Sequence, residues 1–228
     1  MIIIKFSDNI PHRYKSFDKI LKLDNYNDII YLDCSCNNLS GLSNLPKLLE
    51  DLNCSNNNLS SLPKLPNSLK ILWCNYNKIS DLPNLPSSLI ELHCTNNNLF
   101  SLPELSNSLI KLQCGNNNLS SLPKLPNSLT NLRCTYNNLS SLPELPNSIT
   151  FINYCHNPIY IYIYKYFNDN YIEYNEYQKK MKKVFAIKIG DWFLECRYNP
   201  KYKYCRKRLM KEYEECYGAS PYIRRTMI

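Results

Sequence analysis

The sequence repeats itself every 20 residues between residues 29 and 162. The stretch "NNLSSLPKLPNSLKILWC" at residues 57–74 returns almost unchanged as "NNLSSLPKLPNSLTNLRC" at residues 117–134. The same step separates six cysteines and seven asparagines, which are Cys34, Cys54, Cys74, Cys94, Cys114 and Cys134, and Asn37, Asn57, Asn77, Asn97, Asn117, Asn137 and Asn157. A period of this length is typical of a solenoid, in which each copy is one turn that buries its apolar side chains only against adjacent copies.

Aligned with one another, the copies share the pattern L-x-x-L-x-C-x-x-N-x-L-S-x-L-P-x-L-P-x-S, which is the signature of leucine-rich repeats. Seven strand segments are predicted, starting at Ile29, Leu49, Leu69, Leu89, Leu109, Leu129 and Ile149. Stacked copies place these strands in a parallel sheet. The predicted fold is a leucine-rich-repeat arc with this sheet on its concave side and extended, proline-rich segments on its convex side, followed by an α-helical segment at the C-terminus.

Each position of the repeat has a physical role. Leu72, Trp73 and Cys74 alternate between apolar and outward positions, which predicts a strand with Leu72 and Cys74 inside and Trp73 outside. Asn77 follows the strand, and its carboxamide can donate and accept hydrogen bonds with main-chain groups of adjacent turns. Pro83 and Pro86 favour an extended conformation, because 20 residues per turn leave no room for a helix.

The repeat resembles that of leucine-rich-repeat effectors secreted by enteric bacteria, whose motif is L-P-x-L-P-x-S-L-x-x-L-x-V-x-x-N-x-L. Cysteine replaces the valine here, and this feature, with the Asn/Tyr/Ile/Lys-rich composition, resembles leucine-rich-repeat proteins of giant DNA viruses of amoebae. Some bacterial members carry a ubiquitin-ligase domain with a Cys-x-Asp nucleophile. Cys196, Cys205 and Cys216 lack that context, so the resemblance does not extend to this activity.

No metal, cofactor or catalytic site is predicted. Cysteines on successive strands form a row with ~4.8 Å between neighbours, whereas zinc needs thiolates that converge on one ion. The regular cysteines are therefore interpreted as small buried hydrophobes, and Cys36 and Cys155, which break the register, as more accessible. The three histidines, His12, His93 and His156, have no neighbouring serine or acidic pattern typical of catalysis. We therefore predict a protein that is not an enzyme.

The two ends of the solenoid are predicted to be closed. Residues 1–28 form an N-terminal cap with an apolar start and a short helix in "YKSFDKILKL", in which Phe17, Ile20 and Leu21 share one face. Residues 29–164 contain the repeats, and "IYIYIYKYF" is predicted to be their last outer segment with a strand-like exit. Two helices are predicted in residues 176–196 and 199–218, the second with apolar side chains at spacings of three and four.

Positive charge is concentrated at the C-terminus. Residues 165–228 contain 15 Lys/Arg and 8 Asp/Glu, whereas residues 1–164 contain 12 and 11. This basic, tyrosine-rich tail has two interpretations: a solvated capping face, or a surface for nucleic acid, anionic membrane or a second protein. The N-terminus has too short an apolar run for a signal peptide and no segment reaches the ~18 apolar residues of a membrane span, which predicts a cytoplasmic setting.

The copies differ from one another mainly at the outward strand positions. One row is Tyr31, Asp51, Ile71, Glu91, Lys111, Asn131 and Phe151; its neighbour is Asp33, Asn53, Trp73, His93, Gln113, Arg133 and Asn153. Exposed convex positions instead keep asparagine, at Asn67, Asn107, Asn127 and Asn147. Random drift alone predicts variation on both sides, so the pattern favours a recognition surface for a protein partner. Its candidate residues are Trp73, His93, Arg133, Ile71, Glu91, Lys111 and Phe151.

Overall fold

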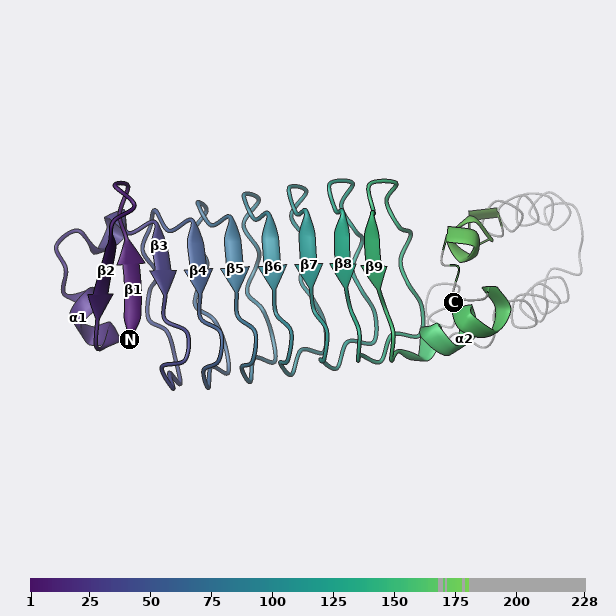
Figure 1. Cartoon of the computed structure of the whole chain (residues 1–228), viewed down its shortest axis with the longest axis horizontal. Helices are drawn as coiled ribbons and strands as arrows, with labels where there is room; N and C mark the ends of the chain where they lie inside the picture. The colour runs from purple at the N-terminus through teal and green to yellow at the C-terminus, as the bar shows by residue number, and fades with distance from the viewer. Residues whose placement is uncertain (168–169, 171, 178, 181–228) are drawn as a thin grey trace, which may run out of the picture. The chain divides into compact units, whose positions relative to one another are not determined.

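The repeats form one continuous sheet in which every turn contributes one short strand. The computed structural model describes residues 1–167, 170, 172–177, 179 and 180, and Met1–Ile172 make up one compact unit. Seven parallel strands lie side by side in it (Figure 1): β3 (Tyr31–Asp33), β4 (Asp51–Asn53), β5 (Ile71–Trp73), β6 (Glu91–His93), β7 (Lys111–Gln113), β8 (Asn131–Arg133) and β9 (Phe151–Asn153). Each strand residue pairs with the residue 20 positions further along, which confirms the predicted solenoid.

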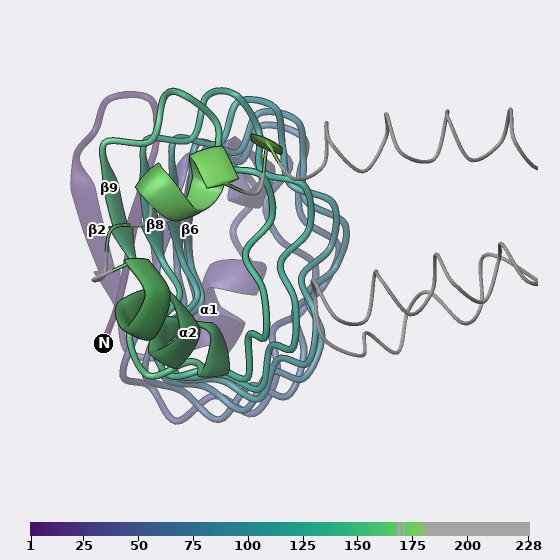
Figure 2. The ribbon, with the colours of Figure 1, turned by 90° about the vertical axis from the view of Figure 1, so that its right-hand side faces the viewer.

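The interior of the solenoid is built from identical positions of successive turns. Leu69, Leu72 and Cys74 of one turn are fully buried, and so are their equivalents Leu89, Leu92 and Cys94 in the next. Each strand begins two residues after the start of its predicted segment. The first residue of the segment, buried in all but the last (Ile149), precedes the paired part of the strand. Viewed along the axis, the strands lie on one side of each turn and extended loops on the other (Figure 2).

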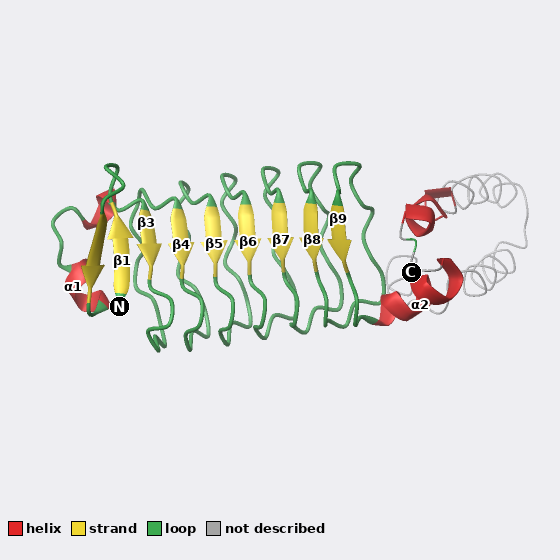
Figure 3. Ribbon diagram, in the orientation of Figure 1, coloured by secondary structure: helices red, strands yellow, loops and turns green. Residues whose placement is uncertain are grey.

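Side-chain hydroxyl groups tie the extended loops of adjacent turns together. Ser88 donates a hydrogen bond from its Oγ to the carbonyl oxygen of Leu69 at 2.6 Å, and Ser68 does the same to Leu49 at 2.8 Å. The loops that contain the Leu-Pro pairs have no helix, as predicted, and the helices of the described chain lie only at its two ends (Figure 3).

The N-terminal cap differs from the prediction by containing a β-hairpin. Strand β1 (Ile2–Lys5) pairs antiparallel with β3, and β2 (Pro11–Tyr14) pairs antiparallel with β1, so the hairpin extends the sheet beyond its first turn. The helix α1 (Phe17–Leu21) is shorter than predicted and is followed by the 3-10 helix η1 (Tyr26–Asp28). Ile20 is buried but Leu21 is exposed, so the two do not share a buried face.

The segment after the last strand is a helix, and the strand-like exit predicted for "IYIYIYKYF" is wrong. Helix α2 (Pro158–Phe167) starts at a proline, whose fixed φ and missing N–H suit the first helical position. Ile159 and Ile163, one helical turn apart, are buried, whereas Ile161 between them is 70% exposed. Alternating strand residues cannot give this pattern, because all three have the same parity. Residues 172–177, 179 and 180 are also helical; most of the two predicted C-terminal helices lies outside the described residues.

Candidate binding site on the sheet face

The outward side chains of β3–β9 form a continuous surface, which we call the sheet face. It consists of two rows, the first residue of each strand and the third, while the middle residue of β3–β8 is a buried leucine and that of β9 is the half-buried Ile152. Trp73 and Arg133 of the second row are exposed, as predicted from the alternation, with Trp73 at 42% exposure. Because equivalent residues on neighbouring strands are ~4.8 Å apart, the spacing of these side chains is set by the solenoid.

A ladder of asparagine side chains holds each strand end in place. Asn97 donates from Nδ2 to the carbonyl oxygens of Cys74 at 3.0 Å and Cys94 at 3.2 Å, and its Oδ1 accepts from the amide of Ile79 at 3.0 Å. One carboxamide thereby satisfies main-chain groups of two turns. The same bonds recur at the other inner rungs, Asn57, Asn77, Asn117, Asn137 and Asn157. The ladder makes the sheet face a rigid platform.

Second-row side chains near the two ends of the sheet bond to their own backbone. Asp33, Asn53 and Asn153 each accept a hydrogen bond from the amide two residues later, at 2.9, 3.1 and 3.2 Å respectively. This Asx-turn interaction occupies the side chain locally. On the four strands β5–β8 the second row consists of residues other than Asp and Asn. These are Trp73, His93, Gln113 and Arg133. The part of the second row that varies from turn to turn without bonding to its own backbone is therefore limited to β5–β8, whereas the sequence predicts a recognition surface over all seven strands.

The centre of the sheet face is a packed cluster around His93. Its ring centroid lies 5.3 Å from that of Trp73, and its Nε2 lies 3.0 Å from Oε2 of Glu91. Lys111 Nζ lies 3.7 Å from the same carboxylate oxygen. His93 is only 7% exposed, and this burial lowers its pKa despite the carboxylate beside it. Sequence reasoning expects His93 to project outward for contact; its position instead supports the exposed Trp73 ring.

The two ends of the sheet face differ in charge. At the N-terminal end, burial and the neighbouring Asp33 raise the pKa of Asp51, while Lys5 on β1 acts in the opposite direction. Lys5 Nζ also lies 4.8 Å from the centre of the Tyr31 ring. At the C-terminal end, the guanidinium carbon of Arg133 lies 4.9 Å from the centre of the Phe151 ring. This cation–π contact restrains the Arg133 side chain on the sheet face.

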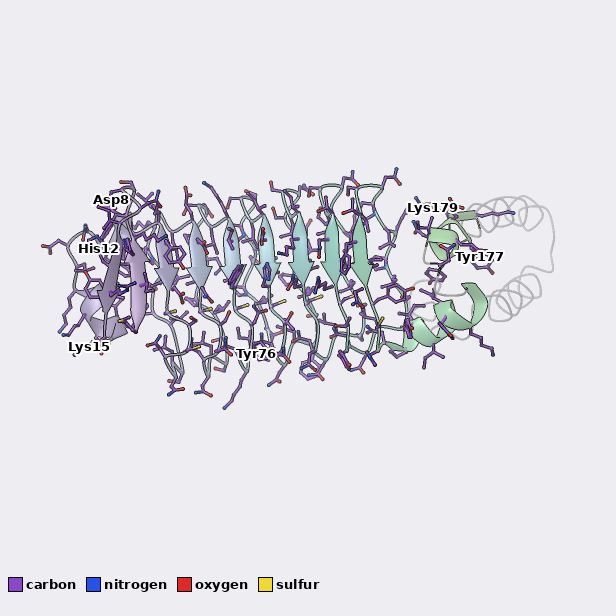
Figure 4. The ribbon with its side chains drawn as sticks, in the orientation of Figure 1. Asp8, His12, Lys15, Tyr76, Tyr177 and Lys179 are labelled. Atoms are coloured by element: carbon purple, nitrogen blue, oxygen red, sulfur yellow. The ribbon has the colours of Figure 1, made fainter. Side chains whose placement is uncertain are left out.

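A column of residues with positive φ borders the sheet face, and sequence reasoning misses it. It comprises Cys36, Asn56, Tyr76, Asn96, Asn116, Tyr136 and His156, with φ between 52° and 57°. Tyr76, labelled in Figure 4, and Tyr136 are exposed, and the ring of Tyr136 stacks on that of His156 at 4.0 Å. The sequence contains a signal for this column, because each of its residues directly precedes an asparagine of the ladder.

The buried cysteines have neither the geometry nor the ionisation of a reactive or metal-binding site. Their sulfur atoms, yellow in Figure 4, recur from turn to turn, and burial raises the pKa of Cys74 and of Cys134 to about 12. Cys36 is exposed and Cys155 half-buried, as predicted. Within the described part of the chain, no three His, Cys, Asp or Glu residues are grouped so that they could hold a metal ion. No described helix is long and apolar enough to span a membrane.

The parallel in-register strands, the asparagine ladder and the extended convex loops define a leucine-rich-repeat solenoid. Its repeats are similar to those of bacterial leucine-rich-repeat effectors of known structure. YopM from Yersinia enterocolitica WA-314 matches 56% of the chain at 42% identity with a TM-score of 0.56, and YopM from Yersinia pestis, a leucine-rich effector protein, matches 56% at 42% identity with a TM-score of 0.54. The leucine-rich-repeat domain of a Shigella effector matches 56% at 41% identity with a TM-score of 0.54.

The similarity covers only part of each of these proteins. The chain matches 29% of the Yersinia enterocolitica YopM chain, 37% of the Yersinia pestis one and 59% of the Shigella domain. A scan against models of protein families and a search of curated proteins give no match.

Proposed function

We propose that this protein is a non-enzymatic interaction module that binds a partner protein through the sheet face. The observation that carries the proposal is the contrast between the two sides of the solenoid. The second row changes from Trp73 to His93, Gln113 and Arg133 over four consecutive strands, whereas one exposed position of the extended loops is asparagine in four of the five turns between β4 and β9, at Asn67, Asn107, Asn127 and Asn147, with Ser87 as the exception. Aromatic side chains and arginine contribute most to interface energy, and the ladder fixes the main chain that carries them, which lowers the entropy lost on binding.

The similarity to effector proteins supports a place of action in the cytoplasm of a host cell. The composition and the cysteine form of the repeat favour a viral source for such a protein. In this proposal Trp73 and Arg133 are the principal contacts. Ile71, Glu91, Lys111 and Phe151 surround them, while His93 supports Trp73.

Two surface substitutions and one core substitution test the proposal. A partner is first isolated with the full chain as bait, and its affinity is then measured by calorimetry. Trp73→Ala or Arg133→Ala should weaken binding by more than ~1 kcal/mol and lower the free energy of unfolding by only about 1 kcal/mol, because each removes one ring contact on the sheet face. Leu72→Ala, one residue away but facing the core, should cost ~2–5 kcal/mol of stability.

Convex substitutions are the matched control for this experiment. Lys64 and Lys124 are exposed on the extended loops, so Lys64→Ala and Lys124→Ala should leave binding unchanged. If these two abolish binding while Trp73→Ala and Arg133→Ala bind as the wild type does, the recognition surface lies on the convex side and the assignment is wrong.

A second candidate function is that of an adaptor whose basic tail binds nucleic acid or anionic membrane. The charge of residues 165–228, with 15 Lys/Arg against 8 Asp/Glu, favours it. Binding of a short single-stranded RNA and of vesicles with anionic lipid, measured across a salt series, tests this function. Tight binding at physiological salt that weakens steadily as salt is raised supports the adaptor, whereas weak binding that is already lost at physiological salt contradicts it.

A further inference from the structure

The charged groups of the sheet face are segregated along the axis of the solenoid. Asp33 and Asp51 lie on β3 and β4, and Glu91 on β6 is paired with Lys111 and His93. The outward positions of β7–β9 are Lys111, Gln113, Asn131, Arg133, Phe151 and Asn153, and none of them is acidic. The end of the sheet face formed by β7–β9 is therefore cationic, and the β3–β4 end carries the opposite sign.

Arg133 is the least compensated charge of this cationic end. Among the described residues, no carboxylate lies within ion-pair distance of its guanidinium. Its guanidinium carbon lies over the Phe151 ring, 4.9 Å from the ring centre, in a cation–π contact that uses none of its N–H groups. A guanidinium presents these donors as a rigid fork that matches a carboxylate with two parallel hydrogen bonds.

An exposed aromatic pair borders the same turns. Tyr136 follows Arg133 by three residues and has a φ of 53°, and His156, on which it stacks, has a φ of 57°. Bulky side chains adopt this left-handed conformation at a cost on the order of 1 kcal/mol, whereas asparagine tolerates it. Asn56, Asn96 and Asn116 occupy the equivalent positions of other turns. Tyr136 therefore keeps an exposed aromatic ring in a conformation that other turns give to asparagine, on the turn that also carries Arg133.

We propose that the sheet face binds an acidic segment of the partner protein across β5–β8, which places carboxylates on Lys111 and Arg133 and an apolar side chain on Trp73. This inference rests on the proposed function. Trp73 and Arg133 are three strands apart, which corresponds to ~14 Å. In an extended segment that crosses the strands, the apolar residue and the carboxylate that contact them are about four residues apart.

The balance of charge favours an acidic protein segment over a nucleic acid. The two rows of the sheet face contain three carboxylates, Asp33, Asp51 and Glu91, and two cations, Lys111 and Arg133. A polyanion needs a continuous cationic surface with several phosphate contacts. An acidic segment can instead contact the two cations at one end while its remaining residues stay clear of Asp33 and Asp51.

Selection of short random peptides on the full chain tests the inference. Peptides of about 12 residues span the sheet face, and their affinities can be measured by fluorescence anisotropy once they are synthesised. We expect the selected peptides to be enriched in Asp and Glu over the starting library. Arg133→Glu and Lys111→Glu should each weaken their binding by at least about tenfold, because the reversed charge repels the carboxylate.

The control is Lys124→Glu, which makes the same charge change on the convex loop of the turn that contains Lys111. It should alter affinity less than about twofold, and circular dichroism melting should be the same for all three variants and the wild type. If Arg133→Glu lowers the melting temperature, Arg133→Gln is measured in its place, and Lys111→Glu remains as the charge-reversal variant. Selected peptides that lack acidic residues, failure to obtain any acidic binder, or equal binding to the charge-reversed variants would overturn the inference.

The outcomes also separate this inference from the proposed function. Peptides that depend on Trp73 but are insensitive to charge reversal at Lys111 and Arg133 leave the sheet face as the binding surface and remove the acidic partner. Peptides that depend only on Lys64 or Lys124 contradict both.

Discussion

The cysteine column shows how burial decides the chemistry of a single residue. A thiol is a nucleophile or a metal ligand only as the thiolate, and burial raises the pKa of Cys94 and of Cys114 well above the usual value. Both residues are fully buried. At neutral pH they are small apolar side chains, and this accounts for the valine found at the same position in the bacterial effector motif.

Substitution of Cys94 tests this interpretation. Cys94→Val should change the free energy of unfolding by less than ~1.5 kcal/mol, because volume and polarity stay close to those of cysteine. Cys94→Ser should cost ~1–3 kcal/mol, because a hydroxyl group is then buried in an apolar row. Urea denaturation measures both. A serine variant as stable as the wild type would contradict the packing role.

Asp51 provides a second prediction for a single residue, through the pH dependence of stability. Burial and Asp33 raise its pKa, so ionised Asp51 destabilises the folded state at neutral pH. Asp51→Asn should therefore raise the melting temperature at pH ~7, and the gain should disappear when the pH falls below the carboxyl pKa and the wild-type side chain is neutral as well. Asp24→Asn, at an exposed position, should have no effect at either pH. Stabilisation by Asp51→Asn that is equal at neutral and acid pH would rule out the electrostatic cause.

At the scale of the structural element, the turn is held by its asparagine. The Asn97 carboxamide bonds to Cys74 and Cys94 and accepts from Ile79, so Asn97→Ala leaves buried main-chain groups unpaired. We expect a loss of ~1–3 kcal/mol in the free energy of unfolding. The adjacent Asn98 is exposed, and Asn98→Ala should stay within ~0.5 kcal/mol. Equal effects of the two substitutions would show that the ladder does not hold the turn.

Helix α2 makes a prediction about how the last turn is closed. Ile163 is fully buried and Ile161 on the opposite side is exposed. Ile163→Ala should cost ~2–5 kcal/mol of stability, whereas Ile161→Ala should have little effect. If the segment were the strand-like exit predicted from the sequence, the two residues would share one face and the substitutions would have similar effects. Thermal melting of the two variants distinguishes these cases.

At the scale of the whole molecule, the solenoid should tolerate the loss of a complete turn. Each strand pairs only with its two neighbours, and residue pairs recur at a separation of 20. Deletion of residues 89–108 joins two equivalent positions, so the product should fold cooperatively. Deletion of residues 89–98 alone places polar loop residues in the core register and should not give a folded product. Cooperative melting of this shorter deletion, measured by circular dichroism, is the result that the solenoid does not allow.

The sequence by itself determined the features that repeat. The 20-residue period determines the number of residues per turn. It also identifies the leucines and cysteines that face the core and the asparagines that form the ladder, because each copy packs against the copies that precede and follow it in the sequence. The outward position of Trp73 and Arg133 follows from the two-residue period of a strand.

Only the tertiary structure shows the features that arise where a residue or turn packs against something other than an identical copy. The hairpin of β1 and β2 forms because the first turn has no preceding copy to pair with, and α2 forms where no further copy follows. His93 is buried because Trp73 and Glu91 lie beside it on the sheet, and Asp33 and Asn53 turn back to their own backbone. A period describes what adjacent copies share; where neighbours differ, packing and hydrogen bonding across the turns determine which side chains remain exposed.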